Sequence, residues 1–296
     1  MESPSIQTLV GIVYIFLGTT LTPVYGRVIY IFASHKRYRT LECYRIMIQI
    51  GIVQCIWGPA AFFIGLTQIL NNDYFMLANS VAKIATTSIR IEAVLSLILA
   101  LNRLKIICGL LYPSAFHMVL IIATWIFGAI YASLLFTPYC GYTVVPGEYL
   151  PKYDLSLPYT ALLMTVGSAL LGIATLLSAV IYIVIVIYLV YKKHHRSSVN
   201  TNFQKEKTIF LYAVVRFSID ITLAVIYNYV DLTEATWTDL PVFTGYILNN
   251  LAVSPILYLC IYKSVRKDFW GRRVKKQSVT AMAMYPNQNS RQQSTT

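Results

Sequence analysis

Four charged residues lie deep inside long apolar runs of the sequence, where their chemistry needs an explanation. Arg90 and Glu92 lie in one run, and Arg216 and Asp220 lie in a later one. A charge at the centre of a bilayer costs roughly 2.5–3.5 kcal/mol on insertion scales, so each side chain needs a partner or a task. Arg216 and Asp220 share a helix face because they are four residues apart. Arg90 and Glu92 point about 200° apart, so one can face the later run while the other faces elsewhere.

Two basic and two acidic side chains can neutralise each other, which favours pairing over an open ion path. We therefore assign Arg90, Glu92, Arg216 and Asp220 to a buried ion network. Three interpretations stay open: a structural network that joins helices, a site for a polar ligand, and a lock between helices that opens on activation. The candidate ligand pocket takes in the polar residues of the same regions, namely Lys83, Thr86, Thr87, Arg90, Asn249 and Asn250.

The residues that could support enzymatic chemistry are missing from the sequence. No cysteine and histidine cluster has zinc-ligand spacing, and His194 and His195 are adjacent in a basic segment. The sequence shows no nucleophile elbow and no catalytic set, so we expect no enzyme, no metal and no cofactor.

The elements that must position these side chains are membrane helices. Of 296 residues, 57% are hydrophobic and only 12% are charged, about half the ~25% of a soluble domain. That composition excludes a soluble globular protein and a disordered chain. A membrane barrel would show short alternating segments, whereas these runs are long and continuous. The sequence predicts an all-α bundle of seven transmembrane helices at Leu9–Ala33, Cys43–Leu66, Met76–Leu101, Ala115–Phe136, Thr160–Tyr191, Ile209–Val230 and Leu240–Tyr262.

The basic residues predict the orientation of the bundle. Every second connecting segment, beginning with the first, belongs to a set that includes the tail from Lys263 and holds 18 Lys and Arg residues. The remaining connecting segments and the N-terminus hold only Lys152. By the positive-inside rule the N-terminus is outside and the C-terminus is cytoplasmic. The net charge of +12 is then topological, so we expect membrane lipids as partners and no nucleic acid.

The chain divides into three predicted parts. Residues 1–262 form the transmembrane domain, 263–276 form a basic amphipathic helix on the membrane surface, and 277–296 form a polar, disordered cytoplasmic tail. Apart from a short N-terminus, only loops and the bundle face outward, so an external ligand must bind there.

Several local sequences resemble motifs of G-protein-coupled receptors. Ala100-Leu101-Asn102-Arg103 is similar to the Asp-Arg-Tyr position of rhodopsin-like receptors, in the Leu-Asn-Arg form of nematode chemoreceptors. Ser254-Pro255-Ile256-Leu257-Tyr258 resembles their Asn-Pro-x-x-Tyr motif, and Trp125 lies in the middle of the fourth run. Resemblance to the nematode serpentine receptors, most like class T, extends to Gly11–Gly18, Cys43–Met47 with Gly51-Ile52, and Phe136-Thr137-Pro138.

This resemblance implies a chemosensory receptor in the plasma membrane, in a sensory cilium if it is a chemoreceptor. It would bind a small external ligand and signal to a heterotrimeric G protein, with Asn102 and Arg103 contacting the G protein and Ser254, Pro255 and Tyr258 forming the helix-seven switch. The alternative is a transporter or channel that uses the buried charges. The chain departs from the receptor pattern because Ile209–Val230 has no Pro or Trp, and because no Cys lies at the start of the third run to pair with Cys140.

Overall fold

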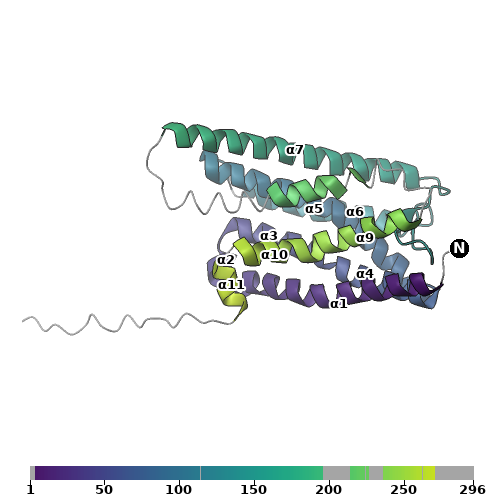
Figure 1. Ribbon diagram of the computed structural model, residues 1–296. Coiled ribbons are helices and arrows are strands. Elements are labelled where there is room, and N and C mark those ends of the chain that lie inside the picture. The colour runs from purple at the N-terminus through teal and green to yellow at the C-terminus, as the bar shows by residue number, and fades with distance from the viewer. Residues whose placement is uncertain are drawn as a thin grey trace, which may run out of the picture.

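The computed structural model describes residues 4–113, 115–195, 214–223, 225–226, 236–261 and 263–270. Within these ranges the chain is helical apart from loops and one small hairpin. The long helices lie side by side along the horizontal axis of Figure 1. We call the end at which the first helix begins the outer end and the opposite end the inner end. That the outer end faces the cell exterior is a prediction from the charges.

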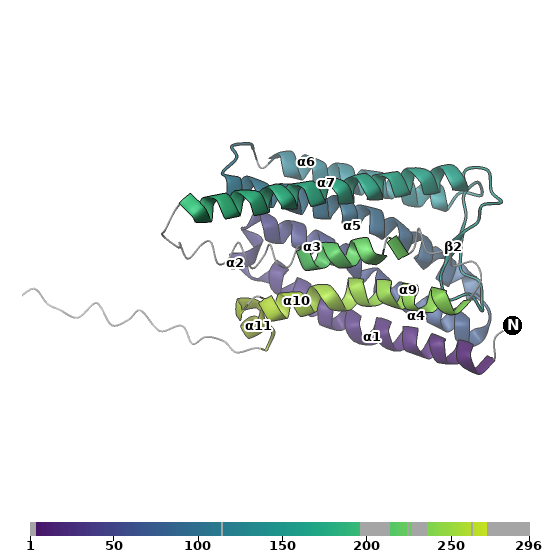
Figure 2. The ribbon, with the colours of Figure 1, turned by 45° about the horizontal axis from the view of Figure 1, so that its top comes forward.

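The helices confirm the predicted all-α bundle of seven. In the described residues, six helical segments are long and apolar enough to span a membrane. Residues 214–223 are also helical and lie in the predicted sixth run (Figure 2). The six segments are α1 (Pro4–Ser34), α3 and α4 (Glu42–Cys55 and Trp57–Leu70), α5 (Leu77–Cys108), α6 (Ala115–Leu135), α7 (Thr160–His195), and α9, η2 and α10 (Thr236–Leu248, Asn249–Val253 and Ser254–Ile261).

Two prolines account for the interruptions in these spans. α3 ends at Cys55 and α4 begins at Trp57 because Pro59 has no N–H to donate to the Cys55 carbonyl, and its ring crowds that carbonyl. The segment η2 is a π-helix that directly precedes α10. Its wider turn makes room for the ring of Pro255, the second residue of α10.

Helix α1 packs most closely on α4, and glycines permit the approach. A Cβ atom on Gly11 would lie 2.6 Å from the Gly65 carbonyl oxygen, and one on Gly65 would lie 2.6 Å from the Gly11 carbonyl oxygen. Small residues at such contacts bring two membrane helices together without a gap.

A β-hairpin connects α6 to α7 and covers the outer end (Figure 2). Its strands β1 (Tyr142–Thr143) and β2 (Lys152–Tyr153) are antiparallel, with Tyr142 opposite Tyr153. Between the strands the side chain of Tyr149 is fully buried, and its carbonyl accepts a hydrogen bond of 3.3 Å from the Tyr14 hydroxyl on α1.

Hydrogen bonds from α4 and α5 hold the hairpin in place. Gln68 donates from Nε2 to the Glu148 carbonyl over 2.7 Å and accepts at Oε1 from the Gly147 N–H over 2.9 Å. The Val144 N–H donates to Asn79 Oδ1 on α5 over 2.7 Å. All five cysteines lie in the described ranges and none of them forms a disulfide there, so side-chain amides, rather than a disulfide, tie the hairpin to the bundle.

At the inner end, the short helices α2 (Lys36–Arg39) and α11 (Lys263–Phe269) lie against α1 (Figure 1). Arg27 donates to the Phe269 carbonyl over 2.7 Å, and the Tyr38 hydroxyl donates to Asp268 over 2.9 Å. In α11 Val265 is buried while Arg266 is exposed, an amphipathic pattern suited to a membrane surface. Residues 271–276 of the predicted surface helix, and the tail beyond them, lie outside the described residues.

Candidate functional site

The centre of the candidate site is Arg216, which contacts two carboxylates. Its Nη2 pairs with Glu92 Oε1 on α5, and its Nε lies 3.3 Å from Asp220 Oδ2, one turn further along its own helix. The Arg216 and Glu92 side chains are only 7% and 9% exposed, whereas Asp220 is 34% exposed. Glu92 is therefore the buried partner and Asp220 the more accessible one.

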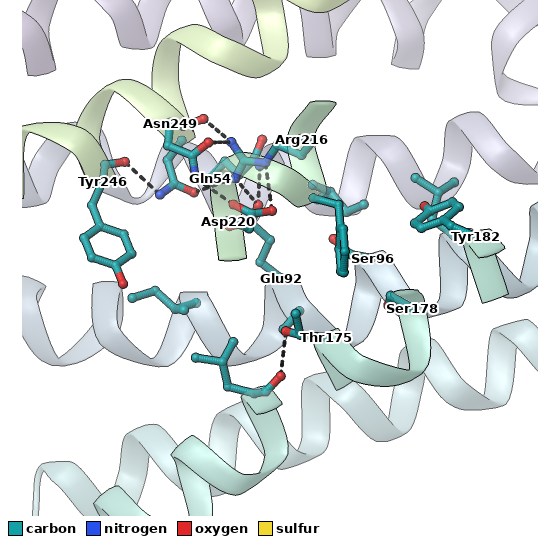
Figure 3. Close-up of a pocket in the computed structure, with 17 residues that line it drawn as sticks. Gln54, Glu92, Ser96, Thr175, Ser178, Tyr182, Arg216, Asp220, Tyr246 and Asn249 are labelled. Carbon is teal, nitrogen blue, oxygen red and sulfur yellow. Dashed lines mark hydrogen bonds and ion pairs between the residues drawn. The ribbon is translucent and has the colours of Figure 1, made fainter. Parts of the chain in front are cut away.

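Amide side chains complete the hydrogen bonding of this group, which Figure 3 shows in one view. Asn249 in η2 accepts from Arg216 Nη1 at its own carbonyl and at Oδ1, and it donates to Asp220 Oδ1 over 2.6 Å. Gln54 on α3 donates to Glu92 Oε1 over 2.5 Å. The cluster thus joins α3, α5, the helical residues 214–223 and η2. The irregular backbone of η2 contributes a carbonyl acceptor directly.

This cluster forms one wall of a cavity of about 80 Å³. The facing wall comes from α7 and carries Thr175, Ser178 and Tyr182 (Figure 3). The Asn250 side chain also lines the cavity and donates to the Tyr246 carbonyl over 2.9 Å. A space of this size has room for several water molecules, and its polar wall would orient them.

Arg90 lies apart from these charges, so the expected four-member network needs correction. Its Nη1 donates to the Thr86 carbonyl over 2.5 Å and to Thr86 Oγ1 over 2.8 Å, and its Nη2 donates to the Tyr153 hydroxyl over 2.7 Å. The guanidinium also lies 5.0 Å from the centroid of the Tyr131 ring. The two-residue spacing explains the separation, because it turns Glu92 toward Arg216 and Arg90 toward the hairpin.

The remaining predicted pocket residues divide between different surroundings. Asn249 and Asn250 line the 80 Å³ cavity, while Thr86 and Arg90 line a smaller one nearer the hairpin. Neither of these two cavities is lined by Lys83 or Thr87. The Lys83 ammonium lies 5.2 Å from the centroid of the Phe136 ring, and the Thr87 hydroxyl donates to the Lys83 carbonyl over 2.9 Å.

At the inner end of α5, the predicted coupling residues are covered. Asn102 is fully buried and donates to Glu42 Oε2 over 3.0 Å. Arg103 is also buried and donates to Cys43 Sγ. Glu42 contacts the buried His117 as well, with 2.9 Å between Oε1 and Nδ1. Side chains from α3 and α6 thus close this end of the bundle around the Asn102-Arg103 pair.

The predicted helix-seven motif is packed in the interior. Ser254 is fully buried, and Pro255 follows the π segment, as described above. The buried Tyr258 ring makes an edge contact with Phe32 on α1, with 5.3 Å between ring centroids. Any rotation of Tyr258 would therefore disturb the packing between α10 and α1.

The charges on the hairpin are paired with each other and with α9. Lys152 Nζ lies 3.2 Å from Asp239 Oδ2 and 3.5 Å from Glu148 Oε2. Burial acts to lower the pKa of the Lys152 ammonium, but the hydrogen bonds and negative charges of Asp239 and Glu148 outweigh it, so that the pKa is raised. Lys152 stays charged and joins the hairpin to the start of α9.

The contribution of the hairpin to the site could not be read from the sequence. Tyr142 and Leu150 line the smaller cavity, and Tyr153 contacts Arg90. A loop has no periodicity that tells which side chains point inward. The available signal was indirect: a tyrosine-rich segment beside a run that carries an unexplained arginine.

The chain is thus a helical bundle with a polar internal cavity and a hairpin over one end. Its fold is that of a seven-helix membrane protein of the rhodopsin-like kind. The solved structure of squid rhodopsin matches this chain with a TM-score of 0.72, covering 92% of this chain and 86% of that one, at 13% sequence identity. At that identity the likeness concerns the fold alone. No family model and no curated protein sequence matches the chain.

Proposed function

We propose that the chain is a G-protein-coupled receptor that binds a small external ligand inside the helix bundle and signals to a cytoplasmic heterotrimeric G protein. The observation that carries the proposal is the charged cluster of Arg216, Glu92 and Asp220, which lines a cavity within a rhodopsin-like bundle. A ligand in that cavity would act on several helices at once, because the cluster joins them.

Helix α5 offers a direct connection from the cavity to the inner end. Glu92 and Arg103 lie eleven residues apart on this one helix, or about 16 Å at 1.5 Å per residue. In the closed arrangement described above, Asn102 and Arg103 are covered. A ligand that favoured a second packing of α5 against its neighbours would uncover them for a G protein. Of the three interpretations of the cluster, the helix lock fits this scheme best.

The finer assignment is a chemosensory receptor of the plasma membrane, most like the nematode serpentine receptors of class T. Its support is the order of short motifs along the chain, above all Cys43–Met47 and the sequence that ends at Arg103. The transporter or channel alternative is less favoured. Arg216 already contacts both Glu92 and Asp220, so these charges are held by each other rather than presented to a moving ion.

The test is nucleotide exchange by purified heterotrimeric G proteins with the full chain in lipid nanodiscs. We expect at least one member of a broad panel of small odorants to accelerate exchange severalfold, and Arg103→Gln to abolish that response while ligand binding persists. Arg45→Gln is the matched control because Arg45 is exposed on α3. Ligand-dependent ion or solute flux in proteoliposomes, without nucleotide exchange by any G-protein class, would overturn the proposal in favour of the transporter.

A further inference from the structure

A second cavity, of about 40 Å³, lies between the hairpin and the first cavity. The two cavities share Ile89, Leu171 and Tyr246 in their walls, so they are neighbours. Tyr142 and Leu150 of the hairpin line the smaller cavity, and Arg90 brings a full charge to it.

Within the described part of the chain, the charge on Arg90 is buried without an acidic partner. The residue is only 5% exposed, its Nη atoms bond to Thr86 and Tyr153, and its Nε has no hydrogen-bond partner among the residues that the structure describes. No carboxylate of the described residues lies within ion-pair distance of it. Hydroxyl and carbonyl partners solvate a guanidinium but do not neutralise it, and a buried charge normally acquires a counter-charge.

The acidic residues described at the outer end are all engaged elsewhere. Asp73 accepts from the Ala78 and Asn79 backbone N–H groups at the start of α5, over 2.9 and 3.0 Å. Glu148 and Asp239 pair with Lys152 as described above. Asp154 accepts from the Ser156 hydroxyl over 2.6 Å, and its pKa is lowered by that bond and by the Ser156 N–H. None of these carboxylates is left for Arg90.

A second unused donor belongs to Trp57, another residue that lines the same cavity. The indole Nε1 of Trp57 is buried and has no hydrogen-bond partner in the described ranges. An indole N–H can only donate, as can a guanidinium. Two unused donors around one small cavity call for an occupant that supplies acceptors, and the full charge on Arg90 calls for an anionic one.

Apart from Thr86 and Ser168, the rest of the wall is apolar or aromatic. The Trp57 and Tyr246 rings are stacked, with 5.6 Å between centroids, and the Phe243 ring lies 5.9 Å from Trp57. Aromatic surfaces of this kind stabilise an apolar group by burial. The occupant therefore needs an acidic head and an apolar body.

From these features we propose that the smaller cavity recognises the carboxylate of a small, apolar organic acid. Arg90 binds the charge, Trp57 donates a second hydrogen bond, and the apolar body lies along Trp57, Phe243 and Tyr246 toward the larger cavity. This inference rests on the proposed receptor function and names the ligand class of that receptor. Tyr153 on β2 holds the guanidinium from the hairpin side.

The experiment measures the thermal stability of the purified full chain in nanodiscs at neutral pH. The probes are the straight-chain carboxylates from acetate to hexanoate, their primary amides, sodium chloride and inorganic phosphate. We expect the longer acids to raise the melting temperature in a saturable way, and the amides and inorganic ions to leave it unchanged. Arg90→Gln should weaken the apparent affinity for hexanoate by about 10- to 100-fold, the range for a hydrogen-bonded charge.

The controls separate this proposal from the receptor function. Arg45→Gln should bind hexanoate like the wild type. If Arg90→Gln does not fold, Trp57→Phe provides the second test. This variant keeps an aromatic ring but removes the indole N–H donor, and it should weaken hexanoate binding severalfold. Equal binding of acids and amides, equal effects of phosphate and hexanoate, or no stabilisation at all would overturn the acid site. This stability assay contains no G protein, so its result is independent of the nucleotide-exchange test described above. Acid binding in this assay, together with no nucleotide exchange in that test, would overturn only the receptor function. Nucleotide exchange driven by neutral ligands alone would overturn only the acid site.

Discussion

At the scale of single residues, two arginines in one membrane protein are held in opposite ways. Arg216 contacts two carboxylates and two asparagines, whereas Arg90 contacts hydroxyls, a carbonyl and aromatic rings. A buried ion pair adds little net stability over an apolar pair of the same shape, but removing one partner is costly because the other charge stays buried. We therefore expect the structure to be destabilised when one charged side chain of the cluster around Arg216 is removed without its partner.

A double-mutant cycle on Arg216 and Glu92 tests that balance. We expect Arg216→Gln and Glu92→Gln each to lower the free energy of unfolding by about 3 kcal/mol, because each leaves a buried charge without its partner. The double variant should be less damaging than the sum, with a coupling of about 1–3 kcal/mol, measured by thermal denaturation in detergent.

The Arg216 and Asp220 pair provides the comparison. Asp220 is 34% exposed and lines the cavity of about 80 Å³, so water in that cavity can replace part of what the pair contributes, and its coupling should be smaller than that of the Arg216 and Glu92 pair. Equal coupling energies in the two cycles would contradict the assignment of Glu92 as the principal partner.

At the scale of elements, the sequence predicted the membrane-spanning helices, which the bilayer requires. It did not predict the features that depend on tertiary contacts. Each membrane helix must satisfy its own backbone and present apolar side chains to lipid, so the apolar runs located the spans closely. The four-residue spacing of Arg216 and Asp220 also placed their shared face correctly. The π segment at Asn249–Val253 and the hairpin contacts of Arg90 depend on neighbouring elements, and no local pattern encodes them.

We expect the hairpin to open locally more often when its hydrogen bonds to Gln68 on α4 are removed. Gln68→Ala leaves the partly buried Glu148 carbonyl and Gly147 N–H without their partner, at a cost of about 1 kcal/mol for each group. We expect hydrogen exchange of hairpin amides, measured by mass spectrometry in nanodiscs, to accelerate at least tenfold. Gln7→Ala is the control, because the hydrogen bond of 3.4 Å from Gln7 to Asn71 is exposed and does not involve the hairpin. Unchanged exchange in Gln68→Ala would show that packing alone holds the hairpin.

At the scale of the whole molecule, the two ends of the bundle have opposite characters. The outer end carries the hairpin, whose Lys152 pairs with Glu148 and with Asp239 of α9, and the cavities beneath it. The inner end carries the Asn102-Arg103 pair closed by Glu42 and His117, together with α11. A receptor needs this polarity, since ligand and G protein approach from opposite sides. The polarity has meaning only if the outer end faces the exterior, which rests on the excess of basic residues at the inner end.

Cysteine labelling in intact cells decides the orientation. Val145 in the hairpin and Leu111 in the loop between α5 and α6 are both exposed and lie at opposite ends. We expect a membrane-impermeant maleimide to label Val145→Cys in intact cells and Leu111→Cys only after permeabilisation, with the wild type giving the background of the native cysteines. The reverse pattern would place the hairpin and its cavities in the cytoplasm. Labelling of both variants from one side would mean that α6 does not cross the membrane, and the proposed route from an external ligand to a G protein would fail with it.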